Sequence, residues 1–168
     1  PNIHKSYNDG VENIKKNKSV SVLTKKHIEI GDNFPNHVIS SVTANKFIED
    51  KSLQQEIFGP CSLLVLCKDQ YEMLNVIKSM EGQLTGTLLA EENDDYLTKE
   101  IINALELKVG RIIFNGVPTG VEVCPSMTHG GPYPASTDSR FSAVGINSIK
   151  RWLRPVSYTH LTLPTMLP

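Results

Sequence analysis

The sequence is poor in cysteine, has no long apolar run and carries no excess of charge of either sign. Its three cysteines, Cys61, Cys67 and Cys124, lack the short paired spacing of a zinc site or a disulfide framework. Its 17 basic and 18 acidic side chains nearly cancel, so we expect neither nucleic acid nor a membrane as a partner. Because it also lacks a membrane-spanning run and a signal peptide pattern, we expect a cytoplasmic protein with reduced thiols that acts on small molecules.

Both ends of the chain are unusual. The first residue, Pro1, is not an initiator methionine, and we expect that the chain begins within a longer protein. The last segment, 156–168, differs in composition from the rest and matches the translation of a common sequencing adapter. We expect that 156–168 is a cloning or assembly scar and not native sequence, the alternative being an authentic terminal β-arm.

Apolar residues recur at helical or strand spacing through most of the chain. One predicted helix carries Ile3, Tyr7, Val11 and Ile14 on one face and ends at the lysine-rich residues 15–18. The other predicted elements are, in order, strands over 19–23 and 37–43, a polar turn or short helix over 44–55, a strand over 61–67, a helix opening at Asp69, a strand over 83–90, a helix over 94–107, a strand over 111–114 and an amphipathic helix over 143–153. Strands that alternate with helices of this length favour an α/β fold with a mostly parallel sheet.

Three finer predictions concern single positions. Asp69 and Glu72 have the spacing of a capping box at the start of a helix. Gly110 follows a predicted helix, where a cap favours positive φ. The side chains expected to face the core from the two central helices are Met73, Val76, Ile77 and Met80 in the first, and Leu97, Ile101, Ala104 and Leu105 in the second.

Residues 56–60 read Glu-Ile-Phe-Gly-Pro, a pattern suited to a dinucleotide site. In an extended segment residues two apart face the same way, so Glu56 and Phe58 should point together while Gly59 and Pro60 fix the exit. A carboxylate can accept hydrogen bonds from both hydroxyls of a nicotinamide ribose, and an aromatic ring can lie against the nicotinamide. Taken alone, Glu56 is better explained as a solvated charge at the start of a strand.

The surrounding sequence decides between these interpretations. The E-x-F-G-P pattern is followed by R-I-I-F-N-G-V-P-T-G-V-E-V-C at 111–124, by H-G-G-P-Y-P-A-S-T-D-S-R at 129–140 and by R-W-L-R-P at 151–155. This order and spacing resemble the aldehyde dehydrogenase superfamily, in particular the NADP-dependent branch that contains 2-oxoglutarate semialdehyde (2,5-dioxovalerate) and bacterial fatty aldehyde dehydrogenases. The resemblance runs from about residue 3 to residue 155.

The resemblance implies a catalytic cycle whose main groups lie outside this chain. In the family a cysteine thiolate attacks the aldehyde, hydride passes to the nicotinamide cofactor, and a glutamate activates the water that hydrolyses the thioester. The nucleophile of the family precedes the E-x-F-G-P motif, so no catalytic residue is expected in this chain. Residues 1–60 would end the thiol-bearing catalytic domain, and residues 61–155 would form a C-terminal α/β segment with a substrate-side loop over 115–142.

None of the three cysteines is expected to replace that nucleophile. Cys61 and Cys67 lie in an apolar, strand-like run, where a thiol usually packs as a small hydrophobic side chain. Cys124 lies in the expected substrate-side loop, at a family position that is not the nucleophile. We therefore favour a packing or pocket-wall role for Cys124 over catalysis.

The resemblance also assigns binding roles within the chain. Glu56 and Phe58 become the contacts to the nicotinamide ribose and the nicotinamide, and Asn115 and Gly120 belong to a loop that shapes the aldehyde tunnel. The Asn115-Gly116 pair is equally typical of a turn, and the two roles are compatible.

The expected pocket also includes Cys124 and His129. For His129 we favour an imidazole that donates to a backbone carbonyl and holds a loop over an imidazole that titrates in catalysis. Asp138 and Arg140 most simply form a local charged anchor, with recognition of a substrate carboxylate by Arg140 as the alternative. His4, His27 and His37 are scattered, so no metal site is expected.

The sequence therefore predicts the C-terminal part of an NADP-dependent enzyme that oxidises 2-oxoglutarate semialdehyde to 2-oxoglutarate, inactive in isolation. NAD is the alternative cofactor, and the full-length protein is expected to form a homo-oligomer. Two other functions remain open. One is oxidation of a fatty or other aldehyde, which the apolar residues Val117, Val121, Val123 and Met127 would suit. The other is a remnant that binds cofactor without catalysis.

Overall fold

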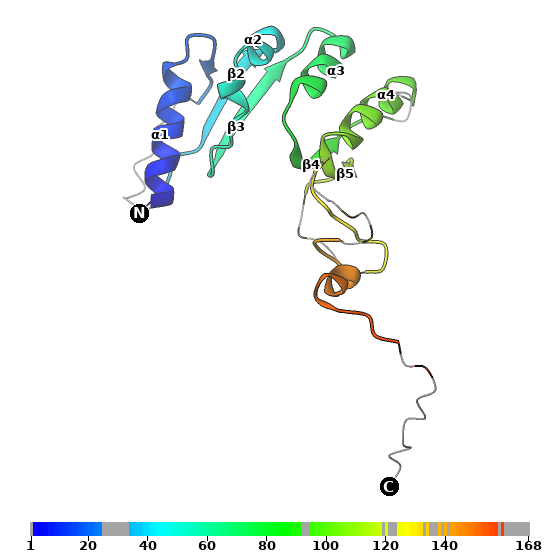
Figure 1. The fold of residues 1–168 in the computed structure, drawn as a ribbon. Coiled ribbons are helices and arrows are strands. Elements are labelled where there is room, and N and C mark those ends of the chain that lie inside the picture. The colour runs from blue at the N-terminus through cyan, green and yellow to red at the C-terminus, as the bar shows by residue number, and fades with distance from the viewer. Residues whose placement is uncertain are drawn as a thin grey trace.

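Helices and strands alternate along the chain, and the last part extends away from them (Figure 1). The computed structural model describes residues 2–24, 34–91, 95–118, 120, 124–132, 134, 138, 140, 142–157 and 159. The first half of these elements comprises α1 (Asn2–Lys16), β1 (Ser21–Val22), β2 (Val38–Thr43), α2 (Ala44–Glu49) and the short 3₁₀ helix η1 (Lys51–Gln54). The second half comprises β3 (Cys61–Leu66), α3 (Gln70–Ser79), β4 (Gln83–Leu88), α4 (Asp95–Glu106), β5 (Val109–Phe114) and the 3₁₀ helix η2 (Ile146–Trp152).

The strands of the described residues form two small sheets. In the first, of order β1-β2-β3, β2 and β3 are parallel and β1 is antiparallel to β2. In the second, β4 and β5 are parallel. Each parallel pair is joined by a helical crossover, α2 with η1 in the first sheet and α4 in the second, because parallel neighbours cannot be joined by a tight turn. The α/β class with mostly parallel pairing is confirmed, and the pairing is divided between two sheets.

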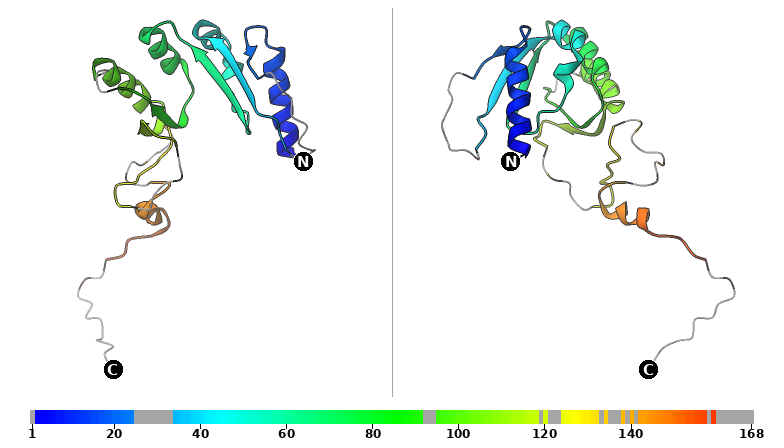
Figure 2. Two further views of the ribbon diagram at one scale, coloured as in Figure 1. Left: turned by 180° about the vertical axis from the view of Figure 1, so that it is seen from behind. Right: turned by 60° about the vertical axis from the view of Figure 1, so that its left-hand side comes forward.

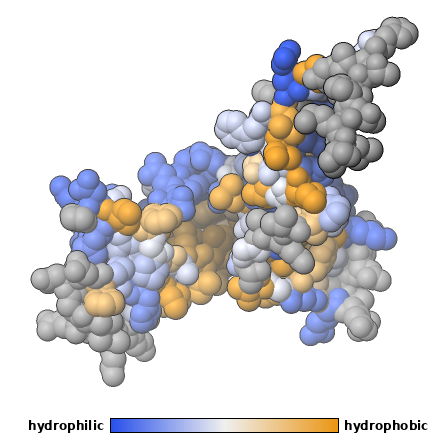
Figure 3. Space-filling model, turned by 90° about the horizontal axis from the view of Figure 1, so that it is seen from below, coloured by the Kyte–Doolittle hydropathy of each residue, from blue (hydrophilic) through white to orange (hydrophobic). Residues whose placement is uncertain are grey.

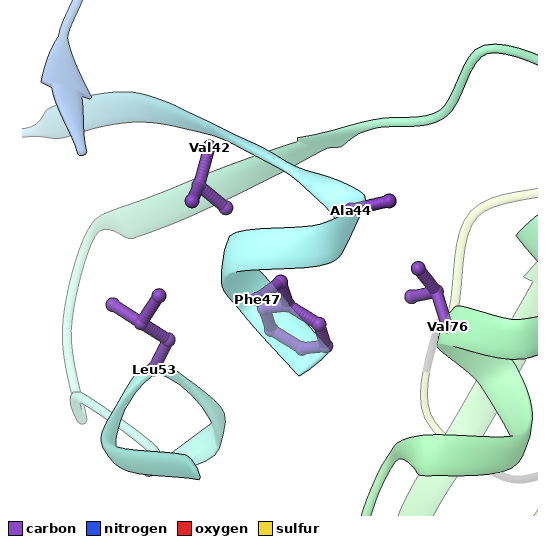
Figure 4. Close-up of a cluster of buried hydrophobic side chains, with 5 residues drawn as sticks. All are labelled: Val42, Ala44, Phe47, Leu53 and Val76. Carbon is purple, nitrogen blue, oxygen red and sulfur yellow. The ribbon is translucent and has the colours of Figure 1, made fainter. Parts of the chain in front are cut away.

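We call the sheet β1-β2-β3 with the helices packed on it the first unit, and the pair β4-β5 with α4 the second unit. The core of the first unit lies where α2, η1 and α3 cover one face of β2 and β3 (Figure 4). Its fully buried side chains are Val42, Ala44, Phe47, Leu53 and Val76. At the other end of the same face, Tyr7 and Val11 of α1 pack on Val38. Of the four residues on the predicted face of α1, Tyr7, Val11 and Ile14 form a buried stripe, whereas Ile3 is 65% exposed.

Helix α3 packs against both units, and this changes which of its residues are buried. Val76 joins the core of the first unit, whereas Leu74 and Ile77 pack with the buried side chains of β4 and α4. The prediction that Met73 faces the core is wrong, because 40% of its surface is exposed and Leu74 takes the inward position. Met80 is partly buried against the first unit, as predicted. A helix between two cores buries a wider stripe than one facing a single core.

The capping prediction for α3 is confirmed. The Asp69 carboxylate accepts a hydrogen bond from the Glu72 N–H at 2.8 Å, and Asp69 is the residue that precedes the helix. The Glu72 carboxylate reaches back to the N–H of Lys68 at 2.6 Å, one residue further than the usual capping box. In α4, Ile101 and Ala104 are buried and Leu105 is partly buried, as predicted, whereas the Leu97 side chain lies outside the described residues.

The C-terminal part differs from the predicted amphipathic α-helix. Residues Ile146–Trp152 form a 3₁₀ helix that lies apart from the sheets and buries no side chain (Figure 2). Side chains three residues apart are aligned in a 3₁₀ helix, so Ile146, Ile149 and Trp152 share one exposed apolar face. Without a surface to pack against, the apolar pattern does not produce a buried helix face. In the part of the chain that the structure describes, no helix combines the length and apolar character needed to cross a bilayer.

The other face of the first sheet is not covered by any of these helices. Ile39, Leu64 and Leu66 alternate with the buried residues of β2 and β3 and are all substantially exposed. Figure 3 shows apolar side chains on the surface of the molecule. An isolated chain therefore presents apolar sheet surface to solvent.

Candidate functional site

The segment 56–60 connects η1 to β3 and is extended. Glu56 is exposed, Ile57 is half-buried and 69% of the Phe58 surface is exposed. Ile57 packs into the cluster formed by Tyr7, Val11 and Val38. Because Ile57 faces inward, its neighbours on both sides face outward, as the alternation of an extended segment requires.

A buried tyrosine of α1 holds the end of this segment. Tyr7 exposes only 3% of its surface, and its hydroxyl donates to the carbonyl oxygen of Asn36 at 2.5 Å and lies 3.2 Å from that of Pro60. Burial, and secondarily the nearby Cys61 thiol, raise the pKa of the Tyr7 phenol above its ordinary value. The phenol therefore remains a neutral donor at physiological pH.

Gly59 is required by both its conformation and its surroundings. Its φ of +155° is one that residues with a side chain rarely adopt. A β-carbon at Gly59 would also overlap the ring of Tyr7. Contact with the Tyr7 ring of α1 therefore explains why the fourth residue of the motif is glycine.

Glu56 lines a cavity of about 450 Å³ between α1 and the residues around η1. The other polar side chains around this cavity are Ser6, Asp9, Asn13, Asn17, Ser52 and Gln55. Phe58 is not among the lining residues, so of the two predicted cofactor contacts only Glu56 faces the cavity. A cavity lined by carboxylate, amide and hydroxyl groups suits a ligand that is rich in hydroxyl groups.

Asp50 organises one end of this cavity. Its carboxylate accepts hydrogen bonds from the Asn17 amide at 2.8 Å and from the Ser52 hydroxyl at 2.6 Å. The hydrogen bonds from Ser52, followed by the one from Asn17, lower the pKa of Asp50. The Asp50–Ser52 contact is a local capping pattern that the sequence could have indicated, whereas the Asp50–Asn17 contact and the carbonyl partners of the Tyr7 hydroxyl lie in distant parts of the chain.

Asn115 stands at the carboxyl end of β5 and links it to the end of β4. Its side-chain oxygen accepts from the Ala90 N–H at 2.9 Å, and its side-chain nitrogen donates to the Ala90 carbonyl at 3.0 Å. Its own N–H donates to the Leu88 carbonyl at 2.9 Å, and its φ is +45°. These contacts support the chain-turning role of Asn115, and contact with a substrate stays a prediction.

His129 anchors the later part of the loop. Its N–H donates to the Ser142 hydroxyl at 2.9 Å, and its carbonyl accepts from the Ala143 N–H at 2.9 Å. The imidazole Nδ1 accepts from the Gly131 N–H at 3.3 Å, so this ring nitrogen acts as an acceptor and not as the predicted donor. The loop-holding role is thus supported by different hydrogen bonds from those expected.

The prediction that Gly110 is a helix cap with positive φ is wrong. Gly110 lies within β5 and has no positive φ. A β-carbon there would instead overlap the imidazole ring of His129. Just before β4, a β-carbon at Gly82 would lie 2.6 Å from the β-carbon of Pro132. The segment that begins at His129 therefore packs against Gly82 and Gly110, at the amino ends of β4 and β5.

The structure divides the predicted substrate-side residues between the two ends of these strands. Asn115 lies at the carboxyl end of β5, whereas His129 packs on Gly110 near the amino end of the same strand. Five residues of strand separate Gly110 from Asn115, which corresponds to about 17 Å. Gly120 is exposed, and no atom of the described residues lies within 4 Å of the position that its β-carbon would occupy. Cys124 is half-buried, with its sulfur 3.4 Å from the Ser126 hydroxyl. Residues 119, 121–123, 133, 135–137, 139 and 141 of the predicted loop lie outside the described residues.

Asp138 and Arg140 form the predicted charged anchor. The guanidinium of Arg140 donates to Asp138 at 2.6 Å and 2.9 Å. Hydrogen bonds from Arg140 lower the pKa of the Asp138 carboxyl to about 2. The alternative, an Arg140 that binds a substrate carboxylate, would require the guanidinium to leave this partner or to share its donors.

Cys61, the first residue of β3, and Cys67, the residue after β3, are packed as expected. Cys61 lies against the cluster around Tyr7, and Cys67 lies against the core of the first unit. Burial raises the pKa of both thiols, which disfavours the nucleophilic thiolate. Among the described residues, no three or more histidine, cysteine or acidic side chains are placed to hold a metal ion.

Two curated proteins match most of the chain. The alpha-ketoglutaric semialdehyde dehydrogenase of Acinetobacter baylyi is 48% identical over 116 residues, which is 69% of this chain and 22% of that protein. Alpha-ketoglutaric semialdehyde dehydrogenase 2 of Azospirillum brasilense is 45% identical over 117 residues, which is 70% of this chain and 22% of that protein. The chain therefore spans about a fifth of the length of these relatives. No protein-family model matches it.

Solved structures show the same fold. The Delta-pyrroline-5-carboxylate dehydrogenase of Mycobacterium tuberculosis superposes with a TM-score of 0.69 and 21% identity over 100% of this chain and 31% of that chain. The succinic semialdehyde dehydrogenase of Streptococcus pyogenes, solved in complex with NADP+, superposes with a TM-score of 0.58 and 19% identity over 76% of this chain and 27% of that chain.

Proposed function

We propose that this chain, which belongs to the aldehyde dehydrogenase superfamily, is part of an NADP-dependent enzyme that oxidises 2-oxoglutarate semialdehyde to 2-oxoglutarate. The observation that carries the proposal is the 45–48% identity to two proteins named for this substrate. The described geometry adds support, because Glu56 and Phe58 face outward from a segment that α1 holds rigidly.

Within this proposal, Glu56 and Phe58 contact the cofactor. The Glu56 carboxylate lines the polar cavity beside α1 and can accept hydrogen bonds from ribose hydroxyls. The exposed Phe58 ring offers a flat apolar surface to a nicotinamide. The bound cofactor would supply the hydride acceptor, and the chain's contribution is to position it.

The remaining parts of the reaction are assigned to the rest of the parent protein. The nucleophilic cysteine and the general base would precede this chain, which agrees with the packed, high-pKa thiols of Cys61 and Cys67. Residues 1–60 would complete the thiol-bearing domain, and 61–155 would carry the substrate-side loop, with Asn115, Gly120, Cys124 and His129 contributing to its walls. We also propose a homo-oligomeric, cytoplasmic parent.

NADP is the proposed cofactor and NAD is the alternative. The succinic semialdehyde dehydrogenase neighbour was solved with NADP+, whereas the Mycobacterium tuberculosis neighbour was also solved with NAD. A second candidate substrate is a long-chain aldehyde, because the loop residue Val117 is apolar and exposed and Met127 follows in the same loop. Turnover of 2,5-dioxopentanoate and of a long-chain aldehyde by the full-length parent, each with NADP and with NAD, would distinguish these possibilities.

The role of Glu56 is tested in the same full-length protein. We expect Glu56→Gln to raise the KM for NADP roughly 10- to 100-fold, because a hydrogen bond to a charged group is worth roughly 1.5–3 kcal/mol. Glu81→Gln is the matched control, since Glu81 is exposed and does not line the cavity, and it should leave the KM unchanged. Equal KM values for wild type and Glu56→Gln would contradict the assignment of Glu56 to the cofactor.

A further inference from the structure

The hydroxyl of Tyr7 lies where the first two parallel strands begin. Asn36 precedes β2 and Pro60 precedes β3, and the carbonyls of both face this hydroxyl. The Pro60 carbonyl also accepts the N–H of Val38 at 2.9 Å. One helix side chain thus joins the starts of two strands and the last residue of the 56–60 segment.

The ring of Tyr7 acts on the same segment from the side. It occupies the space that a side chain at Gly59 would need, and it packs in one cluster with Ile57. These contacts hold the residues on both sides of Phe58. Because its two neighbours are held against α1, the Phe58 side chain is directed away from the helix and towards solvent.

A second close approach fixes the distance between α1 and this segment. A β-carbon at Gly10 would lie 3.1 Å from Cγ1 of Ile57, so the helix surface is flat where Ile57 meets it. Gly10 stands three residues after Tyr7 and so lies on the same side of α1. The helix therefore contacts residues 57, 59 and 60 together, with little space for the segment to shift.

We infer that Tyr7 is a positioning residue for cofactor binding, acting through the segment that carries Glu56 and Phe58 without touching the cofactor itself. This inference rests on the proposed function, because Glu56 and Phe58 are its assumed cofactor contacts. It adds a residue from α1 that the motif does not contain. Loss of the Tyr7 hydroxyl should loosen the segment while the ring still fills the space beside Gly59.

The test compares Tyr7→Phe with Tyr71→Phe in the full-length parent. Tyr71 is an exposed tyrosine of α3, remote from the segment, and serves as the matched control. We expect Tyr7→Phe to raise the KM and Kd for NADP about 3- to 10-fold, the range of one neutral hydrogen bond. The KM for the aldehyde should change less than about twofold. Tyr71→Phe should change none of these constants.

A double-mutant cycle separates positioning from general loosening. If Tyr7 acts through the segment that carries Glu56 and Phe58, Tyr7→Phe should have a smaller effect on NADP binding in a Glu56→Gln background than in the wild type. Full additivity of the two changes, or equal losses for NADP and aldehyde, would overturn the inference. An active enzyme in which Glu56→Gln leaves the KM for NADP unchanged would instead refute the proposed role of Glu56, which distinguishes the two failures.

Discussion

Three glycines in this chain are explained by the side chain that each one accommodates. Tyr7 lies against Gly59, His129 against Gly110 and Pro132 against Gly82. Only Gly59 also has a positive φ, so the other two serve close approach and not backbone conformation. In each pair the partner comes from a distant part of the chain, and the glycine marks a tertiary contact.

Gly110→Ala tests this interpretation at the His129 contact. The added methyl group would displace the imidazole ring from β5, and we expect the free energy of unfolding to fall by about 1–3 kcal/mol, as for overpacked sites. Gly120→Ala is the matched control, because no atom of the described residues lies within 4 Å of its β-carbon position. Urea unfolding of the two variants measures the difference. Equal stability of both variants would show that the loop does not depend on this contact.

Three groups that are buried or partly buried predict how stability depends on pH at alkaline pH. Burial raises the pKa of the Cys61 thiol, the Cys67 thiol and the Tyr7 phenol. Because each folded-state pKa lies above the unfolded value, the stabilising contribution is complete below the unfolded pKa and is lost as pH rises through the folded pKa. The unfolded values are about 8.5 for cysteine and about 10 for tyrosine, so the loss should begin above about pH 8.5.

Urea unfolding at pH 8 and at pH 10.5 checks this prediction. We expect a lower midpoint at the higher pH, and a smaller decrease in Tyr7→Phe, which removes one of the three groups. Tyr71→Phe removes an exposed phenol, so the unfolding midpoint of this variant should decrease with pH as much as that of the wild type. A midpoint that rises with pH would contradict the direction of all three pKa shifts.

The candidate site was only partly predictable from single residues. Alternation predicted that Glu56 and Phe58 face the same way; both are exposed, but only Glu56 lines the cavity. The interpretation of Gly110 was wrong because the reason for this glycine is a histidine in a later loop. Tyr7 appeared only as one apolar position of a helix stripe, since nothing local reveals the two carbonyls that its hydroxyl meets.

At the scale of elements, helices and strands could be predicted where their regularly spaced apolar residues have a surface to pack against. The stripe of α1 and the two crossover units are examples. In α3, Val76, Ile77 and Met80 were predicted correctly, but Leu74 was missed and Met73 was wrong because the helix faces two cores, which its sequence alone does not show. Residues 146–152 have helical apolar spacing without a partner surface, and they form a 3₁₀ helix.

Asn115 shows how one side chain can extend a pair of strands. Asn115→Gly keeps the positive φ and removes both side-chain hydrogen bonds to Ala90, so we expect a loss of about 1–3 kcal/mol in the free energy of unfolding. Asn115→Ala should lose about 1 kcal/mol more, because alanine disfavours positive φ. Asn75→Ala, at an exposed position of α3, should cost nothing measurable. If Asn115→Gly were as stable as the wild type, the link between β4 and β5 would not depend on this side chain.

At the scale of the whole molecule, the described part of the chain leaves much apolar surface exposed, including two faces on which apolar side chains gather. One face of β2 and β3 exposes Ile39, Leu64 and Leu66, and one face of η2 exposes its three apolar residues. Soluble domains rarely leave such faces open, and parallel sheets are usually covered on both sides. The matched residues cover 22% of each relative, and this exposure fits a chain that completes its packing within a larger protein.

The same incompleteness leads to a prediction about activity. We expect the isolated chain to show no turnover of 2,5-dioxopentanoate with NADP, whereas the full-length parent should be active. The thiols of Cys61 and Cys67 are packed with raised pKa values, and among the described residues the Cys124 sulfur lies 3.4 Å from the Ser126 hydroxyl. If the isolated chain were active, and if Cys124→Ala abolished that activity, Cys124 would be the nucleophile and its assignment to the pocket wall would be wrong. Activity that persisted in Cys124→Ala would point instead to Cys61 or Cys67, against the direction of both pKa shifts.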